Sequence, residues 1–338
     1  MTYSEIIQHN CEMVTPAWWP KYAYHFTDVT NAVSILSSGY LYSRNVAGMR
    51  GVMKNENASR QVIDMTNVET TSFVRFYFRP LTPTQYYNEG YKHIQIRYSG
   101  DSGANIPVPI FFLFDLERLL NMKETTFSAQ GQAGHGSPTF RGVESFAKLP
   151  FDKIYSTGPS DKETRSYRHA EILCPDTFMI EKALRWILCR NVFDQLTLLN
   201  MLKEKDELAY YHYKGIIRVV KNNTYYRNGF FVEQVLFNDG VLSFTFSNGQ
   251  AKREYAHRYI TDDKTLQLLT IDFMFEWSNT KKVIARRMQT IQVDYMDATP
   301  IKFRVPSFTG TMKLRVTVSI DNTIICVTEQ SLADSEII

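Results

Sequence analysis

Tyr24-His25-Phe26-Thr27-Asp28-Val29-Thr30-Asn31 places polar side chains where a strand gives way to a helix. Residues 21–26 are typical of a short strand, and Asp28 or Thr30 then supplies a helix N-cap. The helix that follows is expected to end at Gly39, because glycine adopts the left-handed conformation of a helix C-terminus at little cost. The stretch therefore predicts a strand–helix unit that presents polar groups at the end of the strand.

Further strands and helices are expected on both sides of this unit as far as about residue 205. Pro80 and Pro175 each end an apolar run, since proline cannot continue a central strand. Residues 128–142 are rich in glycine and other small residues and are expected to form a mobile loop. The predicted strands are 74–78, 108–114 and 170–174, and the predicted helices are 58–65, 116–120 and 181–202. These segments indicate an α+β domain over residues 1–205.

The pattern changes after residue 206 to short apolar runs separated by turn residues. Asn238-Asp239-Gly240 and Asn248-Gly249 have the composition of hairpin turns. Predicted strands include 230–237, 241–246, 254–259, 272–277, 290–295, 312–320 and 323–327. Residues 206–338 are therefore expected to form a β-rich C-terminal domain, either a sandwich or an open barrel.

Bulk properties constrain the function only weakly. The formal net charge is +3, which neither demands nor excludes a polyanionic partner. Cys11, Cys174, Cys189 and Cys326 lack the paired spacing of a zinc site, so no metal is expected and the thiols are expected to be reduced. Neither a secretory signal nor an apolar stretch of membrane-spanning length is visible, so the protein is expected in the cytoplasm without a membrane partner.

Three separated segments together resemble the DarT family, the DNA-modifying toxins of DarTG toxin–antitoxin pairs. They are residues 24–31, residues 76–83 (Phe-Tyr-Phe-Arg-Pro-Leu-Thr-Pro) and Arg168-His169-Ala170-Glu171. The resemblance covers roughly residues 20–180 and implies the ADP-ribosyltransferase fold, a split mixed sheet that holds NAD in a central cleft. Gly-x-Gly-x-x-Gly and Walker A patterns are absent from the sequence, so neither a Rossmann nor a P-loop route to nucleotide binding is supported.

The resemblance also assigns residues to NAD, which is the expected substrate. His25 and Thr27 match the His-x-Thr motif of the family, and Asn31 matches the polar position beyond it. Arg60 lies where the family has an arginine for the NAD phosphates, and a guanidinium can bind a pyrophosphate bidentately. Tyr77 is expected to pack against nicotinamide or the incoming base. The competing interpretations are a structural histidine at a strand end and a solvated arginine on a helix.

Glu171 is the expected catalytic residue, with Arg60 as a second catalytic candidate. Cleavage of the nicotinamide–ribose bond builds positive charge on the ribose, and a carboxylate stabilises that charge. The same carboxylate can accept a proton from the attacking nitrogen of a base. Position 169 is histidine, so Glu171 is not part of the Glu-x-Glu pair of transferases that modify protein arginine.

The acceptor is expected to be an unpaired nucleobase, because duplex pairing shields the reactive nitrogens. Lys162, Arg165 and Arg168 resemble the basic run of the family, and with Tyr86 and the loop 128–142 they would form the nucleic-acid side of the cleft. The competing interpretation is a solvated charged loop. The basic pairs of the C-terminal part, Lys252-Arg253, Lys281-Lys282 and Arg286-Arg287, either extend this path or are solvated strand faces.

The resulting hypothesis is a toxin that transfers ADP-ribose from NAD to a base of single-stranded DNA. Its role would be growth control in a toxin–antitoxin pair or phage defence, with an antitoxin, and in some cases a chaperone, as partner. Two alternatives remain open: RNA as the acceptor, and a non-catalytic NAD-binding module.

Overall fold

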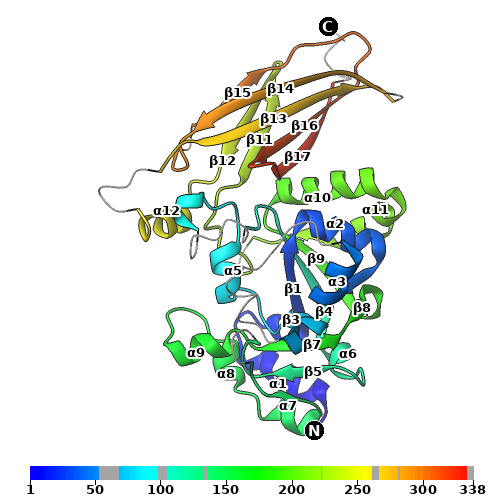
Figure 1. The fold of residues 1–338 in the computed structure, drawn as a ribbon, viewed down its shortest axis with the longest axis vertical. Coiled ribbons are helices and arrows are strands. Elements are labelled where there is room, and N and C mark those ends of the chain that lie inside the picture. Colours follow the sequence, from blue (N-terminus) through cyan, green and yellow to red (C-terminus); the bar gives the residue numbers. More distant parts are fainter. Residues whose placement is uncertain are drawn as a thin grey trace.

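The computed structural model describes residues 1–52, 68–97, 105–132, 136–221, 223–260, 266–280, 282–297 and 299–332. Within these ranges the chain forms a unit of mixed helices and strands, which contains the N-terminus, and a unit rich in strands near the C-terminal end (Figure 1). Helix α10 (Val192–Lys205) lies between the two units in this view.

The mixed unit is built on an eight-stranded sheet of order β10-β9-β4-β1-β3-β7-β5-β6. Strand β1, near the centre of the sheet, pairs with β4 over seven residues. It pairs with β3 at a single position, Tyr24 with Tyr77, so the sheet splits between β1 and β3. All neighbours are antiparallel except β9 and β10. The split mixed sheet predicted from the sequence is confirmed. The strands are β1 (Tyr22–Asp28), β3 (Phe73–Tyr77), β4 (Pro109–Asp115), β5 (Thr126–Ser128), β6 (Thr139–Phe140), β7 (Glu171–Pro175), β9 (Leu184–Cys189) and β10 (Ile217–Val219).

The strand–helix unit predicted at residues 24–39 is present. The Asp28 carboxylate accepts a hydrogen bond from the backbone N–H of Thr30 at 2.9 Å and caps α2 (Val29–Ser38). Gly39 ends that helix at φ 75°. The other helices of the unit are α1 (Tyr3–Met13), α3 (Arg44–Arg50), α5 (Pro83–Asn88), α6 (Leu116–Leu120), α7 (Val143–Ala147), α8 (Phe151–Ile154), α9 (Lys162–Tyr167) and α11 (Glu207–Tyr213), and a short two-stranded sheet pairs β2 (Tyr40–Tyr42) with β8 (Thr177–Met179).

The helix predicted over residues 181–202 is wrong in its first half. Residues 184–189 form β9, which pairs with β4, and α10 begins only after Asn191 caps it through the N–H of Asp194. A short apolar run has no periodicity that separates a buried strand from a buried helix, and the neighbouring strand decides between them. The helix predicted at 58–65 lies outside the described residues.

The C-terminal unit contains two sheets, of order β14-β13-β16-β17 and β11-β12-β15. Phe273 of β13 packs against Phe244 of β12 and Phe303 of β15, with ring centroids 5.2 and 4.7 Å apart, so the two sheets share one aromatic core. This arrangement favours the sandwich among the two expected architectures. The strands are β11 (Val232–Asn238), β12 (Val241–Phe246), β13 (Leu269–Ser278), β14 (Val283–Val293), β15 (Ile301–Arg304), β16 (Lys313–Ile320) and β17 (Thr323–Ser331).

One predicted strand of this unit, 254–259, is wrong. Residues 250–257 form helix α12, and Gly249 is its N-cap, so Asn248-Gly249 is not a hairpin turn. Lys252, Tyr255 and Ala256 are the buried residues of α12, and their spacing of three and four places them on one helix face. The turn at residues 238–240 is confirmed between β11 and β12.

The chain beyond residue 205 first completes the mixed unit. Strand β10 pairs with β9, and Tyr213, Ile217 and Tyr225 belong to the same buried cluster as β1 and β4. We propose that the boundary between the units lies near residue 226 rather than at 205.

Candidate active site

Glu171 begins β7 and is almost wholly buried, with 1% of its surface exposed. Its partner residue on β3 is Tyr77, and its partner on β5 is Ser128, where the glycine-rich loop starts. Directly paired residues of antiparallel strands point to the same side of a sheet, so Tyr77 flanks the carboxylate. The sheet thus brings together two residues that lie far apart in sequence, both predicted to be functional.

The Glu171 carboxylate is held by an arginine that the sequence analysis did not single out. The Nε of Arg75 donates to Oε2 at 2.9 Å and its Nη2 donates to Oε1 at 2.5 Å. Arg75 lies on the same face of β3 as Tyr77, and the two alternate with the buried side chains of Val74 and Phe76. A charged residue inside an otherwise apolar strand was the available signal, because burying a charge is costly unless it is paired.

Burial and the charges of Arg75 and Glu171 shift the pKa values of the neighbouring titratable groups. Burial, followed by the charge of Glu171, raises the pKa of Tyr77. Burial, followed by the charge of Arg75, lowers the pKa of His169 to about 4. His169 is therefore neutral near pH 7, and Arg75 supplies the positive charge beside Glu171.

His25 lies in the split between β1 and β3. Its Nδ1 is 3.1 Å from the carbonyl oxygen of Arg75, and because a carbonyl only accepts, Nδ1 carries the proton. Burial lowers the pKa of His25, so the ring is neutral and its Nε2 is an acceptor. The ring also contacts Phe76 and Phe112 edge-on.

Thr27 and Asn31 follow His25 at the end of β1 and in the first turn of α2. Both side chains are buried, with 1% and 8% of their surfaces exposed. Strand alternation places Thr27 on the same side of β1 as His25 and on the opposite side from Tyr24, which is paired with Tyr77. His25 and Thr27 thus lie on the face of β1 opposite to the face that Tyr24 shares with Tyr77 and Glu171, and His25 reaches β3 across the split through the carbonyl of Arg75. Arg60 lies outside the described residues.

The predicted nucleic-acid residues lie in two places. Lys162 and Arg165 are exposed on α9, while Arg168 follows that helix and donates to Ser156 Oγ and to the carbonyl of Gly158. Tyr86 is on α5, where its ring lies 5.1 Å from that of Tyr226. Arg258, at the C-terminal end of α12, also lies next to Tyr86. Its guanidinium is 5.3 Å above the Tyr86 ring.

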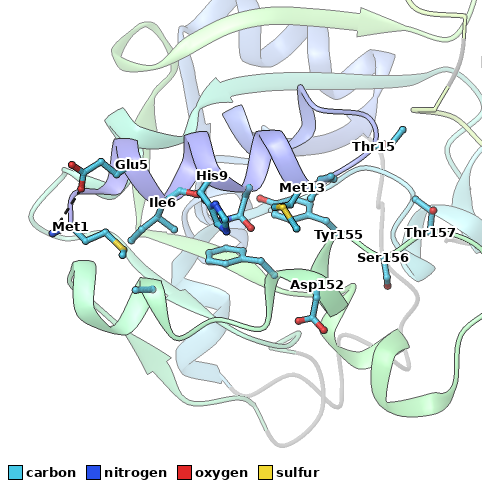
Figure 2. A pocket seen from close by; sticks show the side chains of 14 residues that line it. Met1, Glu5, Ile6, His9, Met13, Thr15, Asp152, Tyr155, Ser156 and Thr157 are labelled. Carbon is cyan, nitrogen blue, oxygen red and sulfur yellow. Dashed lines mark hydrogen bonds and ion pairs between the residues drawn. The ribbon is translucent and has the colours of Figure 1, made fainter.

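A cavity of about 1030 Å³ lies elsewhere, between α1 and α8 (Figure 2). Its lining includes Ile6, His9, Met13, Phe151 and Tyr155, and none of the predicted site residues. Among the described residues, no group of three or more His, Cys, Asp or Glu side chains is arranged to hold a metal ion. In the same part of the chain, no helix is long and apolar enough to cross a membrane.

A split mixed sheet, with a buried glutamate at the start of the strand next to the one that borders the split, defines an ADP-ribosyltransferase. Residues 24–226, more than half of the chain, match the family model described as "ssDNA thymidine ADP-ribosyltransferase, DarT". The chain belongs to the DarT family, which confirms the resemblance carried by the three motifs. It is an NAD-dependent enzyme that transfers ADP-ribose from NAD to a base of single-stranded DNA.

Solved structures of DarT proteins are similar to this chain. DarT of Thermus sp. 2.9 in complex with NAD⁺ is 17% identical, with a TM-score of 0.47, over 61% of this chain and 98% of that one. The same protein with ADP-ribosylated single-stranded DNA is 18% identical, with a TM-score of 0.49, over 61% and 96%. DarTG of Thermosipho africanus with ADP-ribose is 11% identical, with a TM-score of 0.44, over 64% and 53%. No curated protein matches the sequence.

Proposed function

We propose that Glu171 is the catalytic carboxylate of this transferase and that the acceptor is a thymine base. The observation that carries the proposal is the burial of Glu171 at the start of β7, where it pairs with Tyr77 of β3, the strand that borders the split. In a site shielded from water, its charge stabilises the positive charge that develops on the ribose as nicotinamide leaves. The carboxylate then takes the proton of the attacking base nitrogen.

NAD binds along the split in this proposal. The Nε2 of His25 accepts a hydrogen bond from a hydroxyl of the nicotinamide-bearing ribose, since Nδ1 is committed to the carbonyl of Arg75. Thr27 and Asn31 contribute further polar groups at the end of β1, and Tyr77 covers the nicotinamide ring or the incoming base. Arg60 is the proposed partner of the NAD phosphates.

The acceptor strand approaches from α9 and α5. Lys162 and Arg165 are exposed and would contact phosphates, whereas Arg168 is half-buried and braced by Ser156 and Gly158. Tyr86 offers an aromatic ring on the same approach, and stacking on such rings is tolerant of base sequence.

The biological role that fits this chemistry is that of a toxin. The activity would be restrained by an antitoxin, with or without a chaperone, and released in growth control or phage defence. The support for this role is membership of the DarT family.

The direct test is incubation of the protein with labelled NAD and matched DNA and RNA oligonucleotides of the same sequence, with uracil in place of thymine in the RNA. We expect label only on the single-stranded DNA, and none when every thymine is replaced. Labelling of RNA alone would change the proposed polymer, and labelling of thymine-free DNA would change the proposed base. Binding of NAD with no labelled product would leave a non-catalytic module.

A further inference from the structure

Arg75 is placed to do more than hold Glu171. Its two bonds to the carboxylate use the Nε–H and one N–H of Nη2. A guanidinium carries five N–H donors, so three are not used by Glu171. The side chain of Arg75 keeps 28% of its surface exposed, against 1% for Glu171. Arg75 therefore keeps N–H donors that Glu171 does not use, on a side chain that is partly open to solvent beside the carboxylate.

Stabilisation of the fold does not by itself explain the ion pair between Arg75 and Glu171. The ladder between β3 and β7 already joins Arg75 and Glu171 to their strand partners, Leu173 and Tyr77. A buried ion pair contributes little net stability, because the desolvation of both charges offsets their attraction. An arginine in the middle of an apolar strand therefore suggests a role in the chemistry.

We infer that Arg75 binds a carbonyl oxygen of the acceptor base while Glu171 receives the proton of the adjacent ring nitrogen. This inference rests on the proposed role of Glu171 as the base. In this inference the Arg75–Glu171 pair recognises a ring N–H next to a carbonyl group. Thymine has this arrangement on its base-pairing edge.

The balance of the transfer step explains why a cation is needed there. The bond between C1′ of the ribose and nicotinamide breaks, and its electron pair leaves with nicotinamide, which becomes neutral. The lone pair of the ring nitrogen forms the new bond to C1′, and the proton of that nitrogen passes to the Glu171 carboxylate. As the proton leaves, negative charge spreads onto the neighbouring carbonyl oxygen. A fixed N–H donor at that oxygen stabilises the charge in the transition state.

Other charged groups near the carboxylate do not supply this donor. His169 carries no charge near pH 7, since burial and the charge of Arg75 lower its pKa to about 4. Arg168 is turned toward Ser156 and Gly158, to which it donates. Among the described residues, Arg75 is the cation in contact with Glu171.

The test compares two reactions of the same enzyme, transfer to DNA and hydrolysis of NAD by water. Both need Glu171, and only the first needs an acceptor base. In the Arg75→Gln variant, we expect the ratio of DNA modification to NAD hydrolysis to fall on the order of a hundredfold, the usual loss for one oxyanion donor. An unchanged ratio, with both rates lowered together, would overturn the inference and leave Arg75 as a residue that only positions Glu171.

Oligonucleotides with 4-thiothymine or 2-thiothymine give a second readout that does not require the variant to be fast. Sulfur is a weaker hydrogen-bond acceptor than oxygen, so the wild-type enzyme should discriminate against one of the two thio bases. Arg75→Gln should lose that discrimination, and the acidity of the base cancels because the same oligonucleotides meet both enzymes. Equal discrimination by both enzymes, at both positions, would also overturn the inference.

Controls separate this inference from the proposed function. Arg185 donates through Nε and Nη2 to Asp115 on the same sheet, so Arg185→Gln removes a comparable pair and should leave the ratio unchanged. Arg75→Lys keeps a positive charge beside Glu171 and should restore NAD hydrolysis more than DNA modification. If Glu171→Gln modified DNA at the wild-type rate, the proposed function itself would fail, whatever Arg75 does.

Discussion

Gly90 and Gly229 lie backbone against backbone where the mixed unit meets the C-terminal unit. A Cβ atom on Gly229 would stand 2.6 Å from the Cα of Gly90, and one on Gly90 would stand 2.8 Å from the Cα of Gly229. The buried carboxylate of Glu89 accepts the backbone N–H groups of Tyr226 and Arg227 beside this contact. The junction therefore depends on two residues without side chains.

Gly229→Ala should destabilise the protein by about 1–3 kcal/mol, because the added methyl group meets backbone that cannot rotate away. Chemical denaturation would measure the change in the free energy of unfolding. Gly215→Ala is the matched control, since a Cβ there has nothing within 4 Å. Equal free energies of unfolding for the two variants would show that the backbones at Gly90 and Gly229 can move apart without loss of stability.

Glu171→Gln should lower the rate of ADP-ribose transfer on the order of a hundredfold or more while the protein stays folded. Glutamine keeps the shape of the side chain but neither stabilises a cationic ribose nor accepts a proton. A transfer assay with labelled NAD measures the rate, and circular dichroism checks the fold. A variant within a few-fold of the wild-type rate would remove Glu171 from the chemistry.

His25→Ala should weaken NAD binding by about 5- to 150-fold, since loss of one hydrogen-bonding group in a buried site costs about 1–3 kcal/mol. Calorimetric titration with NAD measures the affinity. His212→Ala is the control, because His212 is exposed and pairs with Glu181 on the surface. Unchanged affinity in the His25 variant would place the nicotinamide ribose elsewhere.

Asp28 gives the stability a dependence on pH. Burial raises its pKa from 3.8 to about 6, so the folded protein holds this proton more tightly than the unfolded chain does. Its contribution to the free energy of unfolding is therefore largest below pH 4 and falls as the pH rises to about 6. The full change is about 3 kcal/mol, at 1.36 kcal/mol for each pKa unit.

Asp28→Asn removes this titration and keeps a side-chain oxygen that can cap α2. Relative to the wild type, the variant should gain about 2 kcal/mol in the free energy of unfolding between pH 4 and pH 7, because part of the full change falls below pH 4. Denaturation of both proteins at several pH values measures the difference, and only its change with pH matters. If the difference in the free energy of unfolding between the two proteins did not change between pH 4 and pH 7, burial would not raise the pKa of Asp28.

The part of the fold and the candidate site that could be predicted from the sequence is the part carried by short local motifs. The N-cap at Asp28 and the helix end at Gly39 follow from local patterns, and the choice of Tyr77 and Glu171 follows from the family motifs. The bond between Arg75 and Glu171 could not be predicted in the same way. It depends on the register of two strands that lie far apart in the chain, and a single sequence does not fix that register.

The errors have a related cause. Strand β9 and helix α12 are short segments whose apolar residues fit more than one periodicity. Strand β4 selects the extended form for residues 184–189 by pairing with them. Burial of Lys252, Tyr255 and Ala256 selects the helix for residues 250–257. Tertiary packing decides both cases.

The exposed pair Lys162 and Arg165 on α9 leads to a prediction about salt. If both side chains contact phosphates, the double variant Lys162→Ala/Arg165→Ala should bind single-stranded DNA more weakly at low salt. The slope of log affinity against log salt should also become shallower by about 1.4, since each contact with a single strand contributes about 0.7. Fluorescence anisotropy with a labelled oligonucleotide over a range of salt concentrations measures both quantities.

The control for this prediction is Lys302→Ala/Arg304→Ala, which removes the same charge from exposed positions on β15 in the other unit. A long-range effect of net charge would shift both double variants alike, because it does not depend on where the charges lie. A direct contact would change the slope for the α9 variant alone. Equal slopes in the two variants would mean that α9 is a solvated surface, and the path of the acceptor strand would then have to run past Arg168 and Tyr86 without it.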